Sequence, residues 1–124
     1  MKINRQSLIT EWGNIDYHYS VEEKYPEGIL IFLGSYVETK FRNQGKFKEM
    51  VRDLFSKFPD GTRVHLAVAN KNIVSMFKRS GFKEVDSVEH WGNPSNTVNM
   101  EGFIKKISFT ILTKEEVEAD RCSA

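Results

Sequence analysis

The chain has 124 residues, of which 40% are hydrophobic and 28% are charged, and its formal net charge at pH 7 is +1. This length fits one domain over residues 1–124, and the composition is that of a folded globular protein rather than a disordered one. The near-neutral charge gives no long-range attraction to nucleic acid or to an anionic membrane, so we expect neither as a partner.

Cysteine usage and hydropathy bear on where the protein works. The single cysteine, Cys122, cannot form an intrachain disulfide, which fits a reducing compartment. No apolar run approaches the roughly 18 residues of a membrane span, and the N-terminus lacks the apolar region of a signal peptide. We therefore expect a cytoplasmic location.

The first third of the chain predicts three strands. Residues 2–10 form a possible first strand, and Trp12, Gly13 and Asn14 make a turn. Apolar residues then alternate from Ile15 to Val21, as in a half-buried strand, so residues 2–22 are expected to form an antiparallel hairpin. After a break at Pro26 and Gly28, the apolar run 29–33 and its continuation to 37 predict a central strand buried on both faces, with a bulge or a close backbone approach at Gly34.

The remainder alternates helices and strands. Apolar residues at helical spacing from Phe47 to Phe58 predict a helix, and residues 64–68 predict a strand. Asn70 or Asn72 could cap a second helix that ends at Gly81. Strands are expected over 82–88 and roughly 100–112, separated by a loop over 90–96, and residues 113–124 form a tail or a short helix. The predicted fold class is a mixed α/β sheet, with a central β-α-β-α-β unit between an antiparallel N-terminal hairpin and a C-terminal strand.

One loop has the features of an anion site. The stretch from Arg42 to Phe47 joins the buried strand to a helix and contains Gly45. Backbone N–H groups and the positive end of the helix dipole favour a phosphate there, and a glycine lets the phosphate approach the backbone closely. Arg42, Lys46 and Lys48 add positive charge. A plain strand-to-helix turn with solubilising lysines would look the same, so the loop alone does not decide.

A second stretch strengthens the interpretation. Asn70, Ile73, Phe77 and the pair Gly81-Phe82 follow the next strand, and Arg42-Asn43-Gln44-Gly45-Lys46-Phe47 precedes them. Together the two motifs resemble the GCN5-related N-acetyltransferase (GNAT) family, whose signature is Arg/Gln-x-x-Gly-x-Gly/Ala followed by an Asn, a small apolar residue, a Tyr and a Gly-Phe pair. The resemblance covers residues 28–90 and makes the chain a short, divergent member.

The resemblance implies a coenzyme A site and a reaction. The main chain at Tyr36 and Val37 would bond the pantetheine arm, where the strand is expected to diverge from its neighbour. The N–H groups of Arg42, Asn43, Gln44, Gly45, Lys46 and Phe47 would hold the pyrophosphate. Asn70 would bond the pantetheine region, and Phe77 would also contact the coenzyme. Acetyl-CoA would serve as co-substrate without a metal, and an amine would attack the thioester directly.

The chain departs from the family pattern at three places. Phe47 replaces the usual Gly or Ala, and it would either crowd the pyrophosphate or pack into the core. Phe77 stands where the family often has a Tyr that protonates the leaving thiolate, and phenylalanine cannot donate a proton. Only about 28 residues precede the third strand, where the family has two helices, so the acceptor side would be open or completed elsewhere, with a homodimer as one solution.

The candidate base is Glu38, which lies just beyond the buried strand, although a solvated loop charge is the commoner explanation for a glutamate there. His65, on a strand between Val64 and Leu66, is read as a histidine with an ordinary structural role. Three functions therefore stay open: an N-acetyltransferase acting on an unidentified amine, a non-catalytic GNAT-fold binding or regulatory protein, and an interaction module without a ligand.

Overall fold

The computed structural model describes residues 1–91 and 96–105. Along these ranges the chain forms β1 (Gln6–Thr10), β2 (Gly13–Ser20), β3 (Ile29–Val37), the 3-10 helix η1 (Thr39–Phe41), α1 (Lys46–Phe55), β4 (Arg63–Val68), α2 (Lys71–Arg79), β5 (Lys83–Glu84) and β6 (Val98–Phe103). The predicted order of strands and helices is confirmed, and η1 is an addition that the sequence analysis did not include.

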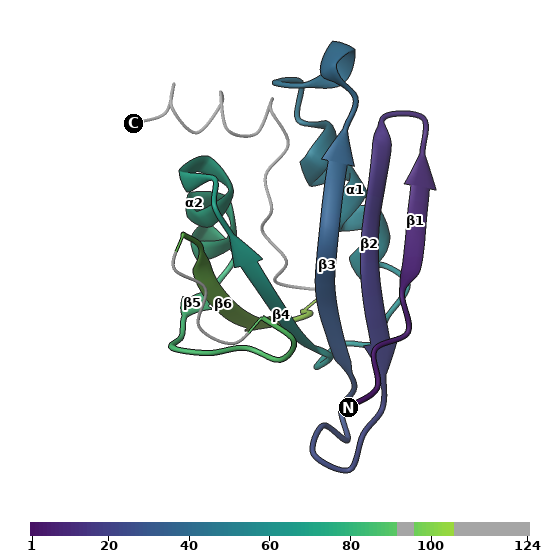
Figure 1. Cartoon of the computed structure of the whole chain (residues 1–124), viewed down its shortest axis with the longest axis vertical. Helices are drawn as coiled ribbons and strands as arrows, with labels where there is room; N and C mark the ends of the chain where they lie inside the picture. The colour runs from purple at the N-terminus through teal and green to yellow at the C-terminus, as the bar shows by residue number, and fades with distance from the viewer. Residues whose placement is uncertain (92–95, 106–124) are drawn as a thin grey trace.

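The strands form one mixed sheet in the order β1-β2-β3-β4-β6-β5 (Figure 1). Strands β1, β2 and β3 make an antiparallel meander, β3 pairs in parallel with β4, and β6 pairs antiparallel to both β4 and β5. This is the expected mixed α/β sheet with an antiparallel N-terminal hairpin. Neither helix of the described part is long and apolar enough to cross a membrane.

Both helices cover the same face of the sheet. Their apolar stripes, which include Leu54 of α1 and Phe77 of α2, pack in one core with Leu30 of β3, Leu66 of β4 and Met100 of β6. Burial of this apolar surface is the main driving force for the fold. The helical spacing seen in the sequence therefore corresponds to the buried face of α1.

The other face of the sheet has a smaller apolar cluster. Ile29, Ile31 and Leu33 of β3 are buried there together with Tyr25, which comes from the loop between β2 and β3. Because alternate residues of β3 serve both clusters, the strand is buried on both faces up to Leu33, as its continuous apolar run predicted.

Several predicted boundaries are wrong at the ends of elements. Strand β1 begins at Gln6 rather than at residue 2, and β5 covers only Lys83–Glu84 rather than 82–88. Past Glu84 the Val85 N–H still donates to the carbonyl oxygen of Asn99 at 3.0 Å, and the Asn99 side chain donates to the carbonyl oxygen of Asp86 at 3.1 Å, so single bonds to β6 follow the two-residue strand. Strand β6 begins at Val98, and the predicted continuation over 106–112 and the segment 113–124 lie outside the described residues.

Candidate coenzyme site

The central feature of the site is a split between β3 and β4. Their parallel pairing covers only Ile29–Ile31 and Arg63–His65, whereas β3 continues to Val37 and β4 to Val68. Figure 1 shows the two strands diverging beyond this pairing. A cavity of about 930 Å³ occupies the split, bounded by the end of β3, the loop into α1, the end of β4, the start of α2 and Trp91. The divergence that the resemblance implied is therefore present.

A bulge lies where β3 leaves the core. Tyr17 of β2 pairs with Phe32, and Asp16 pairs with Gly34, so that Leu33 is an extra residue in β3. This confirms the irregularity predicted at Gly34. A bulge bends its strand. The segment from Gly34 to Val37 therefore runs in a different direction from the buried half of β3.

The loop that precedes α1 presents backbone N–H groups to the cavity. Gly45 is the N-cap of α1 and has a left-handed φ of 74°, which glycine adopts at little cost. As glycine has no side chain, it cannot cap the N–H groups of the first helical turn itself. Gly45, Lys46, Phe47 and Lys48 all line the cavity, which places the positive end of the helix dipole at its wall.

Two predicted ligands instead shape this loop with their side chains. Arg42 Nε donates to the carbonyl oxygen of Val37 at 2.8 Å, and Gln44 Nε2 donates to the carbonyl oxygen of Lys40 at 2.9 Å. Arg42 also lines the cavity, but Gln44 is not among the lining residues. Asn43, which has a left-handed φ of 64°, lines it as well. The motif thus folds the loop as well as contributing to its surface.

Phe47 packs partly against the core of the protein. Of the two outcomes considered for this departure from the family pattern, core packing is thus observed, while part of the residue still lines the cavity. Lys46, next to it, holds its ammonium group 4.7 Å from the ring centroid of Trp12. Phe47 thus divides its contacts between the core and the cavity.

Asn70 is the N-cap of α2, which confirms the first of the two predicted caps, Asn70 and Asn72. Its Oδ1 accepts from the backbone N–H groups of Asn72 at 2.8 Å and Ile73 at 3.3 Å. Because the cap uses the oxygen, the amide nitrogen is the donor that this side chain can offer to a ligand in the cavity it lines. Gly81 follows the helix with φ of 93°, which confirms the predicted stop.

Besides Gln44, three predicted site residues do not line the cavity. Phe77 is fully buried, with its ring centroid 5.0 Å from that of Phe82 and 6.1 Å from that of Phe32, so the expected contact of Phe77 with a coenzyme is replaced by core packing. Tyr36 is half exposed beside the Arg42 guanidinium. Glu38 donates its N–H to the carbonyl of Trp12, and its half-exposed carboxylate lies 4.0 Å from Lys40 Nζ. The roles of Tyr36 and Glu38 stay predictions.

Sequence analysis missed Trp91. Its indole Nε1 donates to the carbonyl oxygen of Phe32 at 2.8 Å, and the residue lines the cavity. The contact joins residues 59 positions apart, and Trp91 was expected only to belong to a loop. No local pattern distinguishes such a tryptophan from one that lies on the surface.

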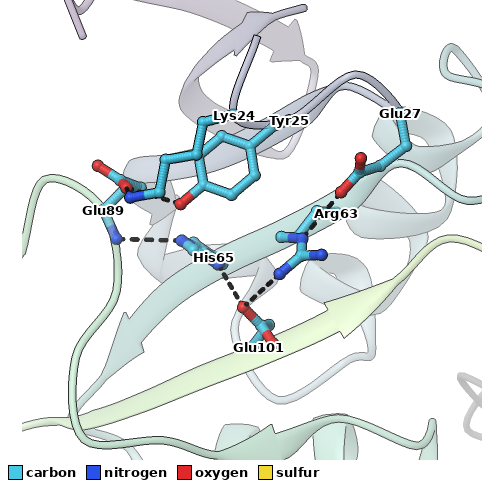
Figure 2. A network of polar contacts seen from close by, with 7 residues as sticks. All are labelled: Lys24, Tyr25, Glu27, Arg63, His65, Glu89 and Glu101. Carbon is cyan, nitrogen blue, oxygen red and sulfur yellow. Dashed lines mark hydrogen bonds and ion pairs between the residues drawn. The ribbon is translucent and has the colours of Figure 1, made fainter. Parts of the chain in front are cut away.

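A polar network lies on the sheet face opposite the helices (Figure 2). The buried His65 donates from Nε2 to Glu101 at 2.7 Å, and its Nδ1 accepts the Glu89 N–H at 3.0 Å. The second bond requires an unprotonated Nδ1, so the ring proton is on Nε2. Arg63 bonds Glu101 at 3.3 Å and Glu27 at 2.9 Å. His65 thus has a structural role, as expected.

Glu89 connects this network to the loop between β2 and β3. Its carboxylate accepts from the Tyr25 hydroxyl at 2.6 Å and from Lys24 Nζ at 2.9 Å. These donors, Tyr25 first, lower the pKa of Glu89 below its usual value of 4.5. Burial and the same contact raise the pKa of Tyr25 above 10.0. In residues 1–91 and 96–105, no three His, Cys, Asp or Glu side chains are grouped so that they could hold a metal ion.

No family model and no curated protein matches this chain. Among solved structures, its fold is similar to that of Arabidopsis thaliana Naa50 in complex with the bisubstrate analogue CoA-Ac-MVNAL, with a TM-score of 0.49 and 18% sequence identity. The match covers 73% of this chain and 64% of that one, so the chain spans less than two thirds of that structure. This likeness does not determine an activity, which has to be argued from the cavity and its lining.

Proposed function

We propose that the chain binds acetyl-coenzyme A in the cavity between β3 and β4 and transfers the acetyl group to an amine. The observation that carries this proposal is the N-terminus of α1, whose glycine-capped first turn forms a wall of the cavity. Such a wall suits a diphosphate, because backbone N–H groups and the helix dipole both favour negative charge.

The charge of the lining supports the same ligand. The described residues around the cavity include the four basic residues Arg42, Lys46, Lys48 and Arg79, and they include no Asp or Glu. This imbalance is local, since the whole chain has a formal net charge of only +1. A polyanion such as coenzyme A would therefore gain electrostatic attraction at this place.

The split supplies room for the rest of the coenzyme. Beyond the bulge, β3 has no parallel partner, so its backbone can bond an extended pantetheine arm in the manner of a neighbouring strand. The amine nitrogen would attack the thioester carbonyl carbon, the carbon–sulfur bond would break, and the thiolate would leave and take up a proton. The amine proton would pass to water or to a base, for which Glu38 stays the candidate.

A second function is favoured by one specific observation. The described lining contains no His, Cys, Asp, Glu or Tyr, and Phe77 is buried away from it. A site without a carboxylate, an imidazole, a thiol or a phenol among these residues is compatible with coenzyme A binding that does not lead to transfer. Release of free thiol from acetyl-CoA in the presence of amines distinguishes the transferase from this binding protein.

Binding itself is tested by the thermal midpoint in the presence of acetyl-CoA and coenzyme A. A tenfold excess over the dissociation constant stabilises the folded state by about 1.4 kcal/mol, or roughly 4 °C for a domain of this size. No rise at millimolar ligand would contradict the proposal.

Two aspartate variants locate the site. Gly45→Asp places a carboxylate in the amide wall, where repulsion of two phosphate charges at about 5 Å and an effective dielectric constant of about 40 costs roughly 3 kcal/mol, or more than 100-fold in affinity. Gly61→Asp is the matched control, because Gly61 has a similar positive φ of 88°, has open space around it and does not line the cavity. Equal affinity of both variants would contradict the phosphate site at Gly45.

A further inference from the structure

Trp91 lies at the end of the cavity where the paired part of β3 and β4 stops. The last parallel pair between β3 and β4 is Ile31 with His65. The carbonyl of the next residue, Phe32, accepts the indole N–H of Trp91 at 2.8 Å. Trp91 therefore lies at the point where the two strands begin to separate, and it lines the cavity there.

We propose that Trp91 limits the acyl group of the bound thioester to a short one such as acetyl. This inference rests on the proposed function, which places the diphosphate at the N-terminus of α1 and the pantetheine arm along β3. From Val37 to Phe32 the strand spans about 16 Å at roughly 3.3 Å per residue, a length comparable to an extended pantetheine arm. The acyl group at the end of that arm would then meet the indole of Trp91.

The indole is held in place from several directions. Two residues before it, Glu89 donates its N–H to His65 and accepts from Tyr25 and Lys24 through its carboxylate (Figure 2). His90 has a left-handed φ of 74°, and its ring packs edge-on against Trp91 at 4.8 Å between centroids. Moving the indole aside would break the bond to Phe32 and leave its carbonyl without that donor.

An indole held at this end of the cavity would select thioesters by the length of their acyl group. An acetyl group adds one methyl group beyond the carbonyl, whereas a hexanoyl group adds four more methylene groups that would have to overlap or displace the indole. Displacing the indole would require the loss of its hydrogen bond to Phe32 and of its ring contact with His90.

The test compares binding of coenzyme A, acetyl-CoA and hexanoyl-CoA by calorimetry. For the wild-type protein we expect hexanoyl-CoA to bind at least tenfold more weakly than acetyl-CoA. In Trp91→Ala the preference should disappear, with the affinity for coenzyme A retained. Phe103→Ala is the control, because Phe103 is comparably exposed and does not line the cavity, so this variant should keep the wild-type preference.

Each outcome has one meaning. Equal binding of acetyl-CoA and hexanoyl-CoA by the wild type, or an unchanged preference in Trp91→Ala, would overturn the role of Trp91 while leaving the coenzyme site intact. Failure of the wild type to bind coenzyme A would contradict the proposed function and this inference with it. Should Trp91→Ala not fold, Trp91→Leu tests the role of Trp91 by the same comparison, since leucine also leaves more space where β3 and β4 separate.

Discussion

Gly13 is the position at which a single methyl group should do the most damage to the site. It begins β2 with φ of 156° and pairs with Val37 of β3. A Cβ atom at this position would overlap the carbonyl oxygen of Tyr36 and would lie 2.8 Å from its carbonyl carbon and 2.9 Å from Cα of Val37. These neighbours are backbone atoms, so no side-chain rotation relieves the contact.

The cost of Gly13→Ala can be worked from this geometry. Restoring ordinary contact distances requires the Cβ atom and the Tyr36 carbonyl to move apart by about 1 Å or more, and overpacking of this kind costs about 1–3 kcal/mol. The unfavourable φ and the weakened bond from the Glu38 N–H to the Trp12 carbonyl each add about 1 kcal/mol. We expect Gly13→Ala to lower the free energy of unfolding by about 3–5 kcal/mol.

Gly34→Ala provides the matched comparison in urea denaturation. A Cβ at Gly34 meets nothing within 4 Å, and its φ is not in the positive range, so this variant should lie within about 1 kcal/mol of the wild type. If Gly13→Ala were as stable as Gly34→Ala, the close approach between the β1–β2 turn and β3 would be wrong, and with it the account of how Tyr36 and Val37 are positioned.

Three further variants, at two positions, test the polar contacts. Glu89→Gln should lower the free energy of unfolding by about 1–2 kcal/mol at pH 7. Because the folded-state pKa of Glu89 is lowered below 4.5, the charge stabilises the fold above that pH and the difference should shrink as the pH falls further; a difference independent of pH in urea denaturation would exclude this mechanism. Asn70→Ala should cost about 1 kcal/mol through loss of the α2 cap, whereas Asn70→Asp should keep the cap and weaken coenzyme A binding; equal thermal midpoints of wild type and Asn70→Ala would show that the cap contributes nothing.

The parts of the fold that could be predicted are those with a local cause. The apolar run of β3 and the helical spacing of α1 follow from burial, and the bulge was signalled by Gly34, a residue that interrupts an otherwise apolar strand. Strand β5 was predicted too long because its end is set outside its own sequence: the residues that follow Glu84 are bonded to Asn99 of β6 through the Val85 N–H and the Asp86 carbonyl.

The residues of the candidate site likewise divide into those with a local signal in the sequence and those that depend on distant contacts. The loop at Gly45 could be located because a glycine, basic residues and a helix start are neighbours in sequence. Trp91 could not, because its partner Phe32 is 59 residues away, and the network around His65 and Glu101 joins residues 36 positions apart. Phe77 matched the spacing of a family motif, but spacing on a helix does not decide whether the ring turns toward the cavity or the core.

The extra residue at Leu33 lets β3 keep its pairing with β2 on one edge while it leaves β4 on the other. Because Phe32 pairs with Tyr17 and Gly34 with Asp16, which are successive residues of β2, the residues of β3 alternate between the two sides of the sheet in the same sense before and after the bulge. Deletion of Leu33 would therefore leave every later residue of β3 opposite its present partner and would remove the bend that the bulge introduces. The direction in which β3 leaves β4, and not the side that its residues face, is the property for which this extra residue is needed.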